Sequence, residues 1–398
     1  MPIEKIAVIG SGLMGHGIAQ VAATSGQEVS LIDLSDELLR KAMEKIEGSL
    51  SKLSEKGKIR EEPRTILKRI KTTTKFPSSL GDADYVIEAV PEDINLKKKI
   101  IGEVDKYAST DAILATNTSG LSITLISEAT RRKERVIGMH WMNPPQIMKV
   151  IEVIKGKYTE NETIQATIEL CRLYNKEPII AHKDIWSFLT GRSHAGWMLE
   201  ACLMYLRGDA DFREIDAVSR YKIGLPMGEF ELMDFVGGVD IRVKGIKSLE
   251  QILGTYPDFE PWPAFLAVNK HLNDRLFRPM SEKGLCGLKT GKGFYNYDEG
   301  RYIRPEISEH FAEKVEPIQL LAPAINVASW CVCNGIGNVD DINKSFRLAY
   351  GWPKGIFEFI DEYDVKSITN VLKTKEKKAP EWLKDFYKAD PVTSLWGS

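Results

Sequence analysis

The sequence predicts an α/β fold, in which an N-terminal doubly wound sheet is followed by a mostly α-helical C-terminal region with two tandem repeats. Three observations support this fold class. A glycine-rich turn joins a short apolar run to a helical pattern at the start of the chain. Strand and helix patterns then alternate over about 140 residues, as they do in a doubly wound parallel sheet. Beyond that part, one segment recurs at a constant spacing, which indicates a duplication.

The opening stretch has the pattern of a dinucleotide-binding turn. An apolar run over 6–9 predicts a buried strand, a helix is expected over 13–24, and a second strand over 29–32. Gly10, Gly12 and Gly15 have G-x-G-x-x-G spacing. The first glycine permits the tight turn, the second lets the backbone approach a pyrophosphate, and the third lets helix and strand pack closely. Such glycines also occur in ordinary turns, but the flanking elements favour a Rossmann-like unit.

An acid at the end of the second strand predicts the cofactor. Asp33 lies 21 residues after Gly12, where a carboxylate can accept hydrogen bonds from a ribose 2′-hydroxyl and repels a 2′-phosphate. The sequence therefore predicts NAD rather than NADP, with its phosphates at the N-terminus of the first helix. The expected contacts of this unit are Gly10, Gly12, Leu13, Met14, Gly15 and Asp33.

Composition narrows the class of protein. A length of 398 residues predicts two or three domains, and 43% hydrophobic with 28% charged residues is typical of a soluble globular protein. The net charge of −2 gives no sign of a nucleic-acid partner or of a membrane. Five cysteines have no metal-ligand spacing, so we expect no metal site and a reducing, cytoplasmic location.

The remaining elements of the sheet follow in order. We expect helix 36–56, helix 63–71, strand 70–74, strand 85–89, a helix ending near 108, strand 112–116, helix 123–130, strand 135–139, strand 149–154 and helix 160–174. Polar residues at 88–92, 117–119 and 140–143 fall at carboxyl ends of these strands, where doubly wound sheets bind their ligands.

The strand pattern stops near Lys183, and the helical part that follows contains the repeat. Segments 199–234 and 326–361 match without a gap at an offset of 127 residues. The identical pairs include Ile215 and Ile342, Gly224 and Gly351, Pro226 and Pro353, Gly228 and Gly355, Glu231 and Glu358, and Asp234 and Asp361. We therefore expect three domains, at 1–183, 184–297 and 298–398.

Three polar residues are candidates for chemistry. A lone serine such as Ser119 is more often a turn or cap residue, and a lone histidine such as His140 is more often structural. Glu152 is less ordinary, because a carboxylate among apolar strand neighbours is costly to bury without a partner. A contact with His140 would remove that cost and orient the imidazole as a general base for alcohol oxidation. Ser119 could then hydrogen-bond the same substrate oxygen.

The motifs around these residues resemble the L-3-hydroxyacyl-CoA dehydrogenase family over nearly the whole chain. They read GSGLMGHGIA (10–19), EAVPED (88–93), NTSGLSIT (117–124), GMHWMNPPQIMKVIEVI (138–154), GLPMGEFELMD (224–234) and KTGKGFYNY (289–297). The resemblance implies NAD-dependent oxidation of (S)-3-hydroxyacyl-CoA to 3-ketoacyl-CoA, in fatty-acid β-oxidation or in 3-hydroxybutyryl-CoA metabolism.

The same resemblance implies roles for individual residues. The family's catalytic serine, histidine and glutamate fall on Ser119, His140 and Glu152. Its further dinucleotide contacts fall on Glu92, Lys97, Ser119, Asn143 and Lys289, and its coenzyme A contacts on Ser49, Lys56 and Ser119. By composition alone, Ser49 and Lys56 would be part of a solvated helix face.

The doubled helical region is similar to archaeal members of the family and to the dehydrogenase part of multifunctional fatty-acid oxidation enzymes. No hydratase domain is expected. In single-copy relatives the helical domains pair between two subunits, so the two copies are expected to pack within one chain as a pseudo-dimer. A homodimer of the whole chain is compatible with that arrangement.

One departure from the family pattern leaves alternatives open. The usual P-G-F-x-x-N-R is here Trp186-Ser187-Phe188-Leu189-Thr190-Gly191-Arg192, so Gly191 replaces an active-site asparagine and Trp186 replaces a proline. Glycine supplies neither the donor nor the acceptor of asparagine. One alternative is a dehydrogenase of a small free 3-hydroxy acid, of the gulonate or carnitine type. The other is a non-catalytic paralogue that binds NAD or acyl-CoA.

Overall fold

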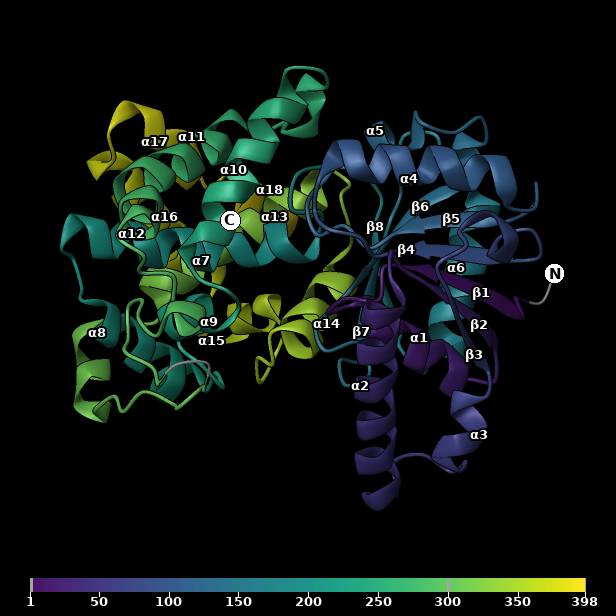
Figure 1. The fold of residues 1–398 in the computed structure, drawn as a ribbon. Helices are drawn as coiled ribbons and strands as arrows, with labels where there is room; N and C mark the ends of the chain where they lie inside the picture. The colour runs from purple at the N-terminus through teal and green to yellow at the C-terminus, as the bar shows by residue number, and fades with distance from the viewer. Residues whose placement is uncertain (1–2, 299–300, 398) are drawn as a thin grey trace. The chain divides into compact units, whose positions relative to one another are not determined.

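The computed structural model describes residues 3–298 and 301–397. The chain divides into two compact units, Met1–Asp184 and Ile185–Ser398. The first is a sheet covered by helices and the second is built from helices (Figure 1), so the predicted fold class is confirmed. The expected further division near 297 lies inside the second unit and stays a prediction.

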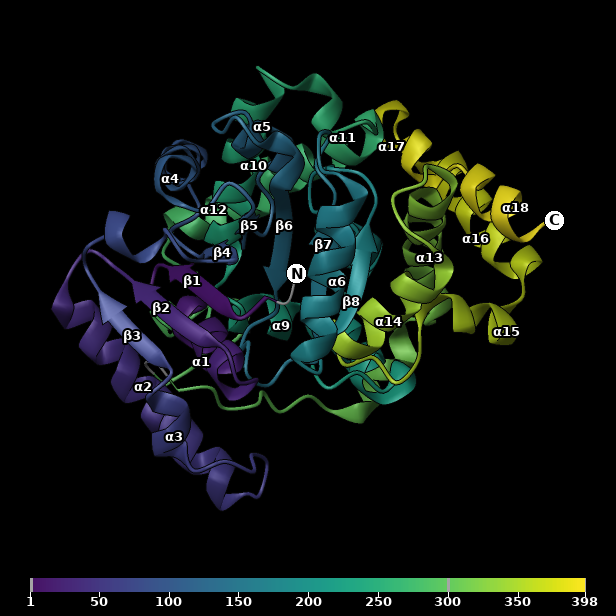
Figure 2. The same ribbon diagram turned by 90° about the vertical axis from the view of Figure 1, so that its right-hand side faces the viewer.

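The first unit is built on an eight-stranded sheet with the order β3-β2-β1-β4-β5-β6-β7-β8 (Figure 2). Every neighbouring pair is parallel except β6 and β7, which are antiparallel. The strands are β1 Lys5–Ile9, β2 Glu28–Ile32, β3 Ile70–Thr73, β4 Tyr85–Glu88, β5 Ile113–Thr116, β6 Val136–Trp141, β7 Val150–Ile154 and β8 Glu177–Ala181.

Helices cover both faces of this sheet. They are α1 Gly15–Thr24, α2 Asp36–Glu55, α3 Pro63–Leu67, α4 Ile94–Tyr107, α5 Ile123–Ser127 and α6 Asn161–Leu173. Apolar residues of α1, α2 and α6 share one core with the strands, and α4 and α5 lie on the other side (Figure 1). The side chains of Ser35 and Asp93 accept hydrogen bonds from the first turns of α2 and α4, which explains where these two helices begin.

The main differences between the observed and the predicted elements concern one helix end and the last three strands. The short helix ends at Leu67 because β3 starts three residues later, at Ile70. β6 continues to Trp141, so His140 lies inside the strand rather than beyond its tip. β7 runs antiparallel to β6, and β8 was not predicted. The β8 segment, EPIIA, is only five residues long and follows α6 closely. In the sequence it therefore looks like part of the loop after that helix rather than like a strand.

The second unit contains helices and isolated bridges in the part of it that the structure describes. The helices are α7 Thr190–Arg207, α8 Phe212–Ala217, α9 Glu229–Phe235, α10 Val239–Leu253, α11 Pro263–Leu272, α12 Arg278–Glu282, α13 Ile318–Cys333, α14 Val339–Ala349, α15 Ile360–Tyr363, α16 Val365–Lys378, α17 Glu381–Tyr387 and α18 Asp390–Trp396. Among the helices of residues 3–298 and 301–397, none has the length and apolar character needed to span a membrane.

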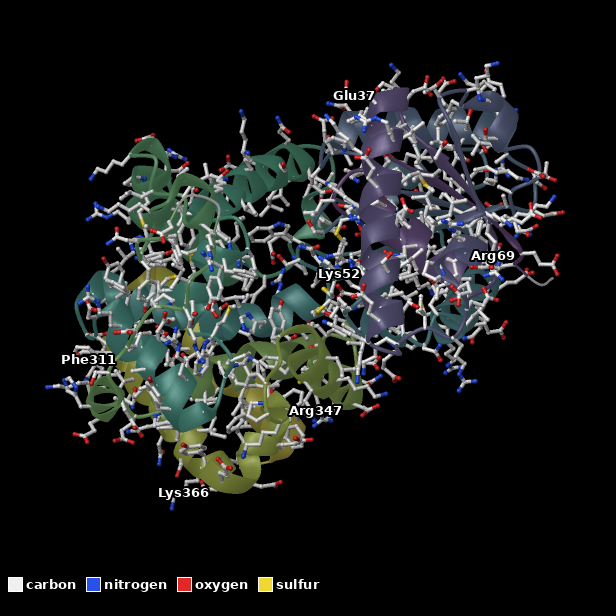
Figure 3. All side chains as sticks on the ribbon, turned by 60° about the horizontal axis from the view of Figure 1, so that its bottom comes forward. Glu37, Lys52, Arg69, Phe311, Arg347 and Lys366 are labelled. Carbon is white, nitrogen blue, oxygen red and sulfur yellow. The ribbon has the colours of Figure 1, made fainter. Side chains whose placement is uncertain are left out.

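Equivalent positions of the two repeats make equivalent contacts. In the first repeat Glu231 accepts a hydrogen bond from the Gly228 N–H at 3.0 Å and pairs with the guanidinium of Arg220. In the second repeat Glu358 accepts from the Gly355 N–H at 2.8 Å and pairs with Arg347, which Figure 3 labels. These two acids therefore fix the same turn in both repeats, 127 residues apart.

The two repeats also touch each other reciprocally. A Cβ placed on Gly224 would lie 3.7 Å from Cγ of Pro353, and one placed on Gly351 would lie 3.2 Å from Cγ of Pro226. Gly224 is equivalent to Gly351, and Pro226 to Pro353, so each repeat contributes the same pair to the contact. Such a pattern is typical of an isologous interface between two copies.

Helices α7 and α13 approach each other closely at a glycine. A Cβ on Gly196 of α7 would lie 2.7 Å from the Pro323 carbonyl oxygen and 2.8 Å from Cα of Ala324, both in α13. Gly196 and Pro323 are again 127 residues apart. Only a residue without a side chain lets the two backbones approach this closely.

We expect Gly196→Ala to lower the free energy of unfolding by roughly 1–3 kcal/mol, because the new methyl group would press on backbone atoms that cannot rotate away. Gly245→Ala is the matched control. Gly245 lies inside α10, and a Cβ added there would meet no atom within 4 Å, so the better helix propensity of alanine should raise stability by up to about 1 kcal/mol. Urea unfolding of the full chain measures both values. Equal effects of the two substitutions would contradict the close approach.

Candidate active site

The carboxyl end of β4 is fixed by a buried acid. Glu88, the last residue of β4, is fully buried. Its carboxylate accepts hydrogen bonds from the Thr116 hydroxyl at 2.6 Å, the Val90 N–H at 2.7 Å and Lys97 Nζ at 2.8 Å. A carboxylate without such partners would be costly to bury. Glu88 therefore joins the ends of β4 and β5 and the start of α4.

A second acid holds the loop that carries Ser119. One carboxylate oxygen of Glu92 accepts from the Thr118 hydroxyl at 2.6 Å, the Ser119 N–H at 2.9 Å and the Gly120 N–H at 3.2 Å. The Ser119 hydroxyl lies 3.3 Å from the same oxygen. The other oxygen lies 3.5 Å from Lys97 Nζ. The sequence predicted Glu92 as a cofactor contact, and the structure gives it the additional role of fixing this loop.

Lys97 is buried beside two acids, Glu88 and Glu92. Its side chain is only 1% exposed, and its ammonium group is held by Glu88 and by the Val90 carbonyl. The side chain of Glu92 is 40% exposed. Lys97 therefore supports Glu92 from a buried position, and its own predicted contact with the dinucleotide stays a prediction.

His140 and Glu152 form a cross-strand pair. The antiparallel register of β6 and β7 places the two residues directly opposite each other. Nδ1 of His140 lies 3.0 Å from the Glu152 carboxylate. The Glu152 side chain is fully buried, whereas that of His140 is 18% exposed. The structure thus brings together the two residues that the sequence paired, and it leaves the imidazole partly accessible to solvent.

The glycine-rich turn has the geometry that a dinucleotide needs. Gly10 has a φ of +94°, which is strained for other residues. A Cβ on Gly15 would lie 1.7 Å from the Gly10 carbonyl oxygen, so only glycine fits where α1 meets β1. A Cβ on Gly12 would meet no protein atom within 4 Å. Gly12 is therefore not needed for packing in the protein, which agrees with its predicted role beside the pyrophosphate.

Asp33 is already engaged with this turn. Its Oδ2 atom accepts hydrogen bonds from the Ser11 N–H at 2.7 Å and from the Ser11 hydroxyl at 2.6 Å, and Oδ1 accepts from the Leu34 N–H. The carboxylate thus closes the turn onto the end of β2. A ribose hydroxyl would join or replace these donors.

The other predicted contacts lie on different parts of the fold. Asn143 is exposed on the connection between β6 and β7. Ser49 lies on the last turns of α2 and Lys56 directly follows them; this helix is largely polar, with Glu37 near its start and Lys52 near its end (Figure 3). Lys289 belongs to the second unit, where its ammonium group pairs with Asp240. Its predicted contact with the dinucleotide stays a prediction.

Gly191 lies in the first turn of α7, beside two strained residues. Ser187 and Phe188 have φ values of +66° and +52°, a conformation that non-glycine residues adopt rarely. A Cβ on Gly191 would lie 3.3 Å from Cβ of Ser187 and would meet no other residue within 4 Å. The following Arg192 is fully buried against the rings of Phe265 and Trp330. A side chain at 191 would therefore require only a small adjustment of Ser187.

Two further residues shape the site: Asn117, which the sequence placed among the polar residues at strand ends without a role of its own, and Asp184, which sequence reasoning missed. The Asn117 side-chain oxygen accepts from the Trp141 N–H at 2.9 Å and so joins the ends of β5 and β6. Asp184 accepts from the Ser122 hydroxyl and from two N–H groups at the start of α5, and burial raises the pKa of its carboxyl group. The sequence signal for Asn117 was its place directly after a buried strand. The signal for Asp184 was its place directly before the helical region.

The geometry defines a class of chemistry. A dinucleotide turn, a histidine paired with a buried acid, and a serine loop all lie in one unit, at or next to the carboxyl ends of β1, β2 and β4–β6. No group of three histidine, cysteine, aspartate or glutamate side chains within the described ranges could hold a metal ion. These features fit proton removal by the imidazole coupled to hydride transfer to a dinucleotide.

Comparison with known proteins agrees with this class. Residues 5–185 match the 3-hydroxyacyl-CoA dehydrogenase NAD-binding domain, and residues 188–297 and 319–394 match the C-terminal domain of the same family. The mitochondrial hydroxyacyl-coenzyme A dehydrogenase of Sus scrofa is 36% identical over 302 residues, which are 74% of this chain and 91% of that protein.

Two solved structures are similar to the chain. The (S)-3-hydroxybutyryl-CoA dehydrogenase of Ralstonia eutropha has a TM-score of 0.67 at 32% identity, and the match covers 75% of this chain and 100% of that one. The 3-hydroxybutyryl-CoA dehydrogenase of Escherichia coli K12 has a TM-score of 0.83, with 100% of this chain and 98% of its own covered, but at 24% identity it supports the fold alone.

The fold and the site thus define an NAD-dependent oxidoreductase with a Rossmann-like cofactor domain. More specifically, the chain belongs to the 3-hydroxyacyl-CoA dehydrogenase family. The predicted family and the predicted cofactor, NAD, are confirmed.

We expect Asp33→Ala to weaken NADH binding by roughly tenfold, because a hydrogen bond to a charged acceptor is lost, and to reduce the discrimination against NADPH. Ser11→Ala is the control, since it removes the hydroxyl that contacts Asp33 but keeps the carboxylate. Fluorescence titration with both dinucleotides measures the ratio. A wild-type chain that preferred NADPH would overturn the interpretation of Asp33.

Proposed function

We propose that the protein oxidises (S)-3-hydroxyacyl-CoA to 3-ketoacyl-CoA, with His140 as the general base. The observation that carries this proposal is the 3.0 Å contact between His140 Nδ1 and the buried Glu152 carboxylate. Because that contact uses Nδ1, a proton taken from the substrate hydroxyl would go to Nε2. When bound, NAD supplies the acceptor for the hydride that leaves C3.

Glu152 has two tasks in this mechanism. It orients the imidazole, and its negative charge stabilises the imidazolium that forms when the hydroxyl proton is taken. Ser119 is proposed to hydrogen-bond the same substrate oxygen, and Glu92 supports it by holding the Ser119 and Gly120 N–H groups. These two acids act on the reaction through the residues that they position.

The acyl-CoA substrate is supported by the relatives, among them the Sus scrofa enzyme named for hydroxyacyl-coenzyme A. We propose Ser49 and Lys56 as its coenzyme A contacts. Both lie near the C-terminal end of α2, and Lys56 is exposed, so its ammonium group could meet a phosphate without first leaving a buried position. A small free 3-hydroxy acid would have no use for these two residues.

We further propose that the helical repeats form a pseudo-dimer within the chain. The reciprocal contacts of Gly224 with Pro353 and of Gly351 with Pro226 support it, and the Gly196→Ala measurement tests the helix contact between α7 and α13. A reducing, cytoplasmic location is proposed as well, supported by the odd number of cysteines, five, which does not make an even disulfide framework. The test labels the cysteine thiols of the native protein with a thiol reagent, once before cell lysis and once after lysis under oxidising conditions. The extent of labelling is then compared between the two samples.

We expect His140→Ala to lower kcat with acetoacetyl-CoA and NADH by about 100- to 10,000-fold, the usual contribution of general acid–base catalysis. NADH affinity should change little, because His140 is not among the proposed cofactor contacts. The loss of NADH absorbance during turnover measures the rate, and fluorescence titration measures the affinity. Turnover within a few-fold of wild type would remove His140 from the mechanism.

Gly191 is expected to change what the site accepts rather than to end the chemistry, because the base, its acid, the serine and the dinucleotide turn are all retained. Gly191→Asn should raise turnover on short 3-ketoacyl-CoA substrates or shift the preferred chain length. One polar contact made mainly in the transition state is worth up to a few kcal/mol, or about 100-fold. Assays with 3-ketoacyl-CoAs of increasing length measure it, with Gly191→Ala as the control for side-chain volume.

The same assays separate the alternative functions. A wild-type chain that binds NADH but turns over no 3-ketoacyl-CoA, and remains inactive as Gly191→Asn, would favour the non-catalytic paralogue. Turnover of free 3-hydroxy acids in preference to their CoA thioesters would favour the gulonate or carnitine type. Either result would overturn the proposed substrate while leaving the NAD-binding domain in place.

A further inference from the structure

We propose that Lys176 is a positioning residue that fixes the β6–β7 connection, residues 142–149, and through it the nicotinamide half of the dinucleotide site. The inference rests on the proposed function, since it concerns the same cofactor. Neither the sequence motifs nor the proposed mechanism uses Lys176. The contacts of its side chain and the place of the connection in the sheet carry the argument.

The Lys176 side chain is buried against the connection. Its ammonium group donates hydrogen bonds to the Pro145 carbonyl oxygen at 2.7 Å and to the Met148 carbonyl oxygen. Both acceptors are backbone atoms, and 8% of the residue is exposed. Within the described residues no carboxylate pairs with this lysine. A charge buried without a counter-ion has a desolvation cost. The hydrogen bonds to the two carbonyl oxygens offset this cost for the Lys176 ammonium group.

The local backbone aims Lys176 at this place. Asn175 has a φ of +53° and ends the turn after α6, a left-handed conformation that asparagine tolerates. The Lys176 N–H then donates to the Cys171 carbonyl, and the next N–H, of Glu177, donates to the Lys149 carbonyl at 2.7 Å. The chain thus enters β8 at the end of the connection, with the lysine side chain directed at it.

The other side of the connection lies against α1. A Cβ on Gly17 would lie 2.8 Å from the side-chain oxygen of Gln146 and 3.0 Å from Cδ of Pro145. α1 begins directly after the glycine-rich turn, at Gly15. The connection is therefore held between the helix that faces the phosphates and the ammonium group of Lys176, and any movement of Pro145 is opposed by both contacts.

The sheet order assigns this connection to one half of the cofactor. In the order β3-β2-β1-β4-β5-β6, the strand order reverses between β1 and β4, where a dinucleotide crosses. Asp33 follows β2 on one side of that point, and Asn143 follows β6 on the other. Because Asp33 is predicted at the ribose of the adenosine half, Asn143 is expected at the nicotinamide half. Lys176 fixes the segment that carries Asn143.

Burial lowers the pKa of Lys176 to about 8. The ammonium form donates more strongly to carbonyl oxygens than the neutral amine does. An arginine at this position would keep its charge and could donate to both carbonyls, whereas a methionine of similar length would leave both carbonyls without their donor. Lys176→Arg keeps the positive charge, and Lys176→Met keeps the side-chain length without the charge. Comparing the two therefore separates the role of the charge from the role of the side-chain volume.

The test compares two ligands on the full chain by calorimetry. NADH reaches both halves of the site, and ADP-ribose lacks the nicotinamide. Lys176→Met is expected to weaken NADH binding about tenfold, because the segment that carries Asn143 would lose the ammonium group that holds it in place before the ligand binds, and to change ADP-ribose binding by less than about twofold. Lys176→Arg should retain most of the NADH affinity. Lys149→Met, an exposed lysine of the same connection, is the matched control and should bind both ligands normally.

Steady-state kinetics provide a second test of the role of Lys176. The KM for NAD should rise in Lys176→Met while kcat at saturating NAD stays within about twofold, since the His140–Glu152 pair is set by the strand ladder. Equal weakening of NADH and ADP-ribose would indicate a general loosening of the domain and overturn the inference, as would unchanged NADH binding. If Lys176→Met does not fold, Lys176→Gln takes its place with the same outcomes. A wild-type chain that binds neither ligand would instead overturn the proposed function.

Discussion

The antiparallel pairing of β6 with β7 is the constraint on which the candidate site depends. In a sheet that is otherwise parallel, this one reversal places His140 and Glu152 on neighbouring strands in direct register. The carboxylate of Glu152 is fully buried and the imidazole of His140 is partly accessible. The acid is therefore shielded from solvent, while the imidazole can still be reached by a substrate. A parallel β7 would need a crossover between the strands, and a one-residue slip of the ladder would turn one of the two side chains to the opposite face.

Around that pair, acids hold the loops of the site. Glu88 joins two strand ends, Glu92 holds the Ser119 loop, Asp33 closes the glycine-rich turn, and Asp184 fixes the start of α5. Each accepts from backbone N–H groups or from hydroxyls, and two of them also meet Lys97. The site is thus preorganised by hydrogen bonds at strand ends, where backbone groups lack ladder partners. The residues proposed for the chemistry, Ser119, His140 and Glu152, are not among these four acids.

Much of this could be predicted from the sequence, because the informative residues lie in local patterns. The glycine spacing, the acid after the second strand and the polar residues after strands indicated the cofactor unit, and the family motifs indicated Ser119, His140 and Glu152. The direction of β7 was missed, although the short 142–149 connection argued for it, since parallel strands need a crossover of a dozen or more residues. The positions of Lys97 and Lys176 could not be predicted, because each depends on partners that only the folded sheet brings near.

The reciprocal contact of the helical repeats has a consequence for how the protein responds to dilution. When such a surface joins two separate chains, the fraction associated falls as the protein concentration falls. In the proposed pseudo-dimer Gly224 and Pro353 belong to one polypeptide, so the pairing of the two repeats is a unimolecular step with a fixed effective concentration. The two copies are also free to diverge: Asp216 and Glu229 in the first correspond to Asn343 and Ile356 in the second. One half of the surface can thus specialise without its counterpart having to change in the same way.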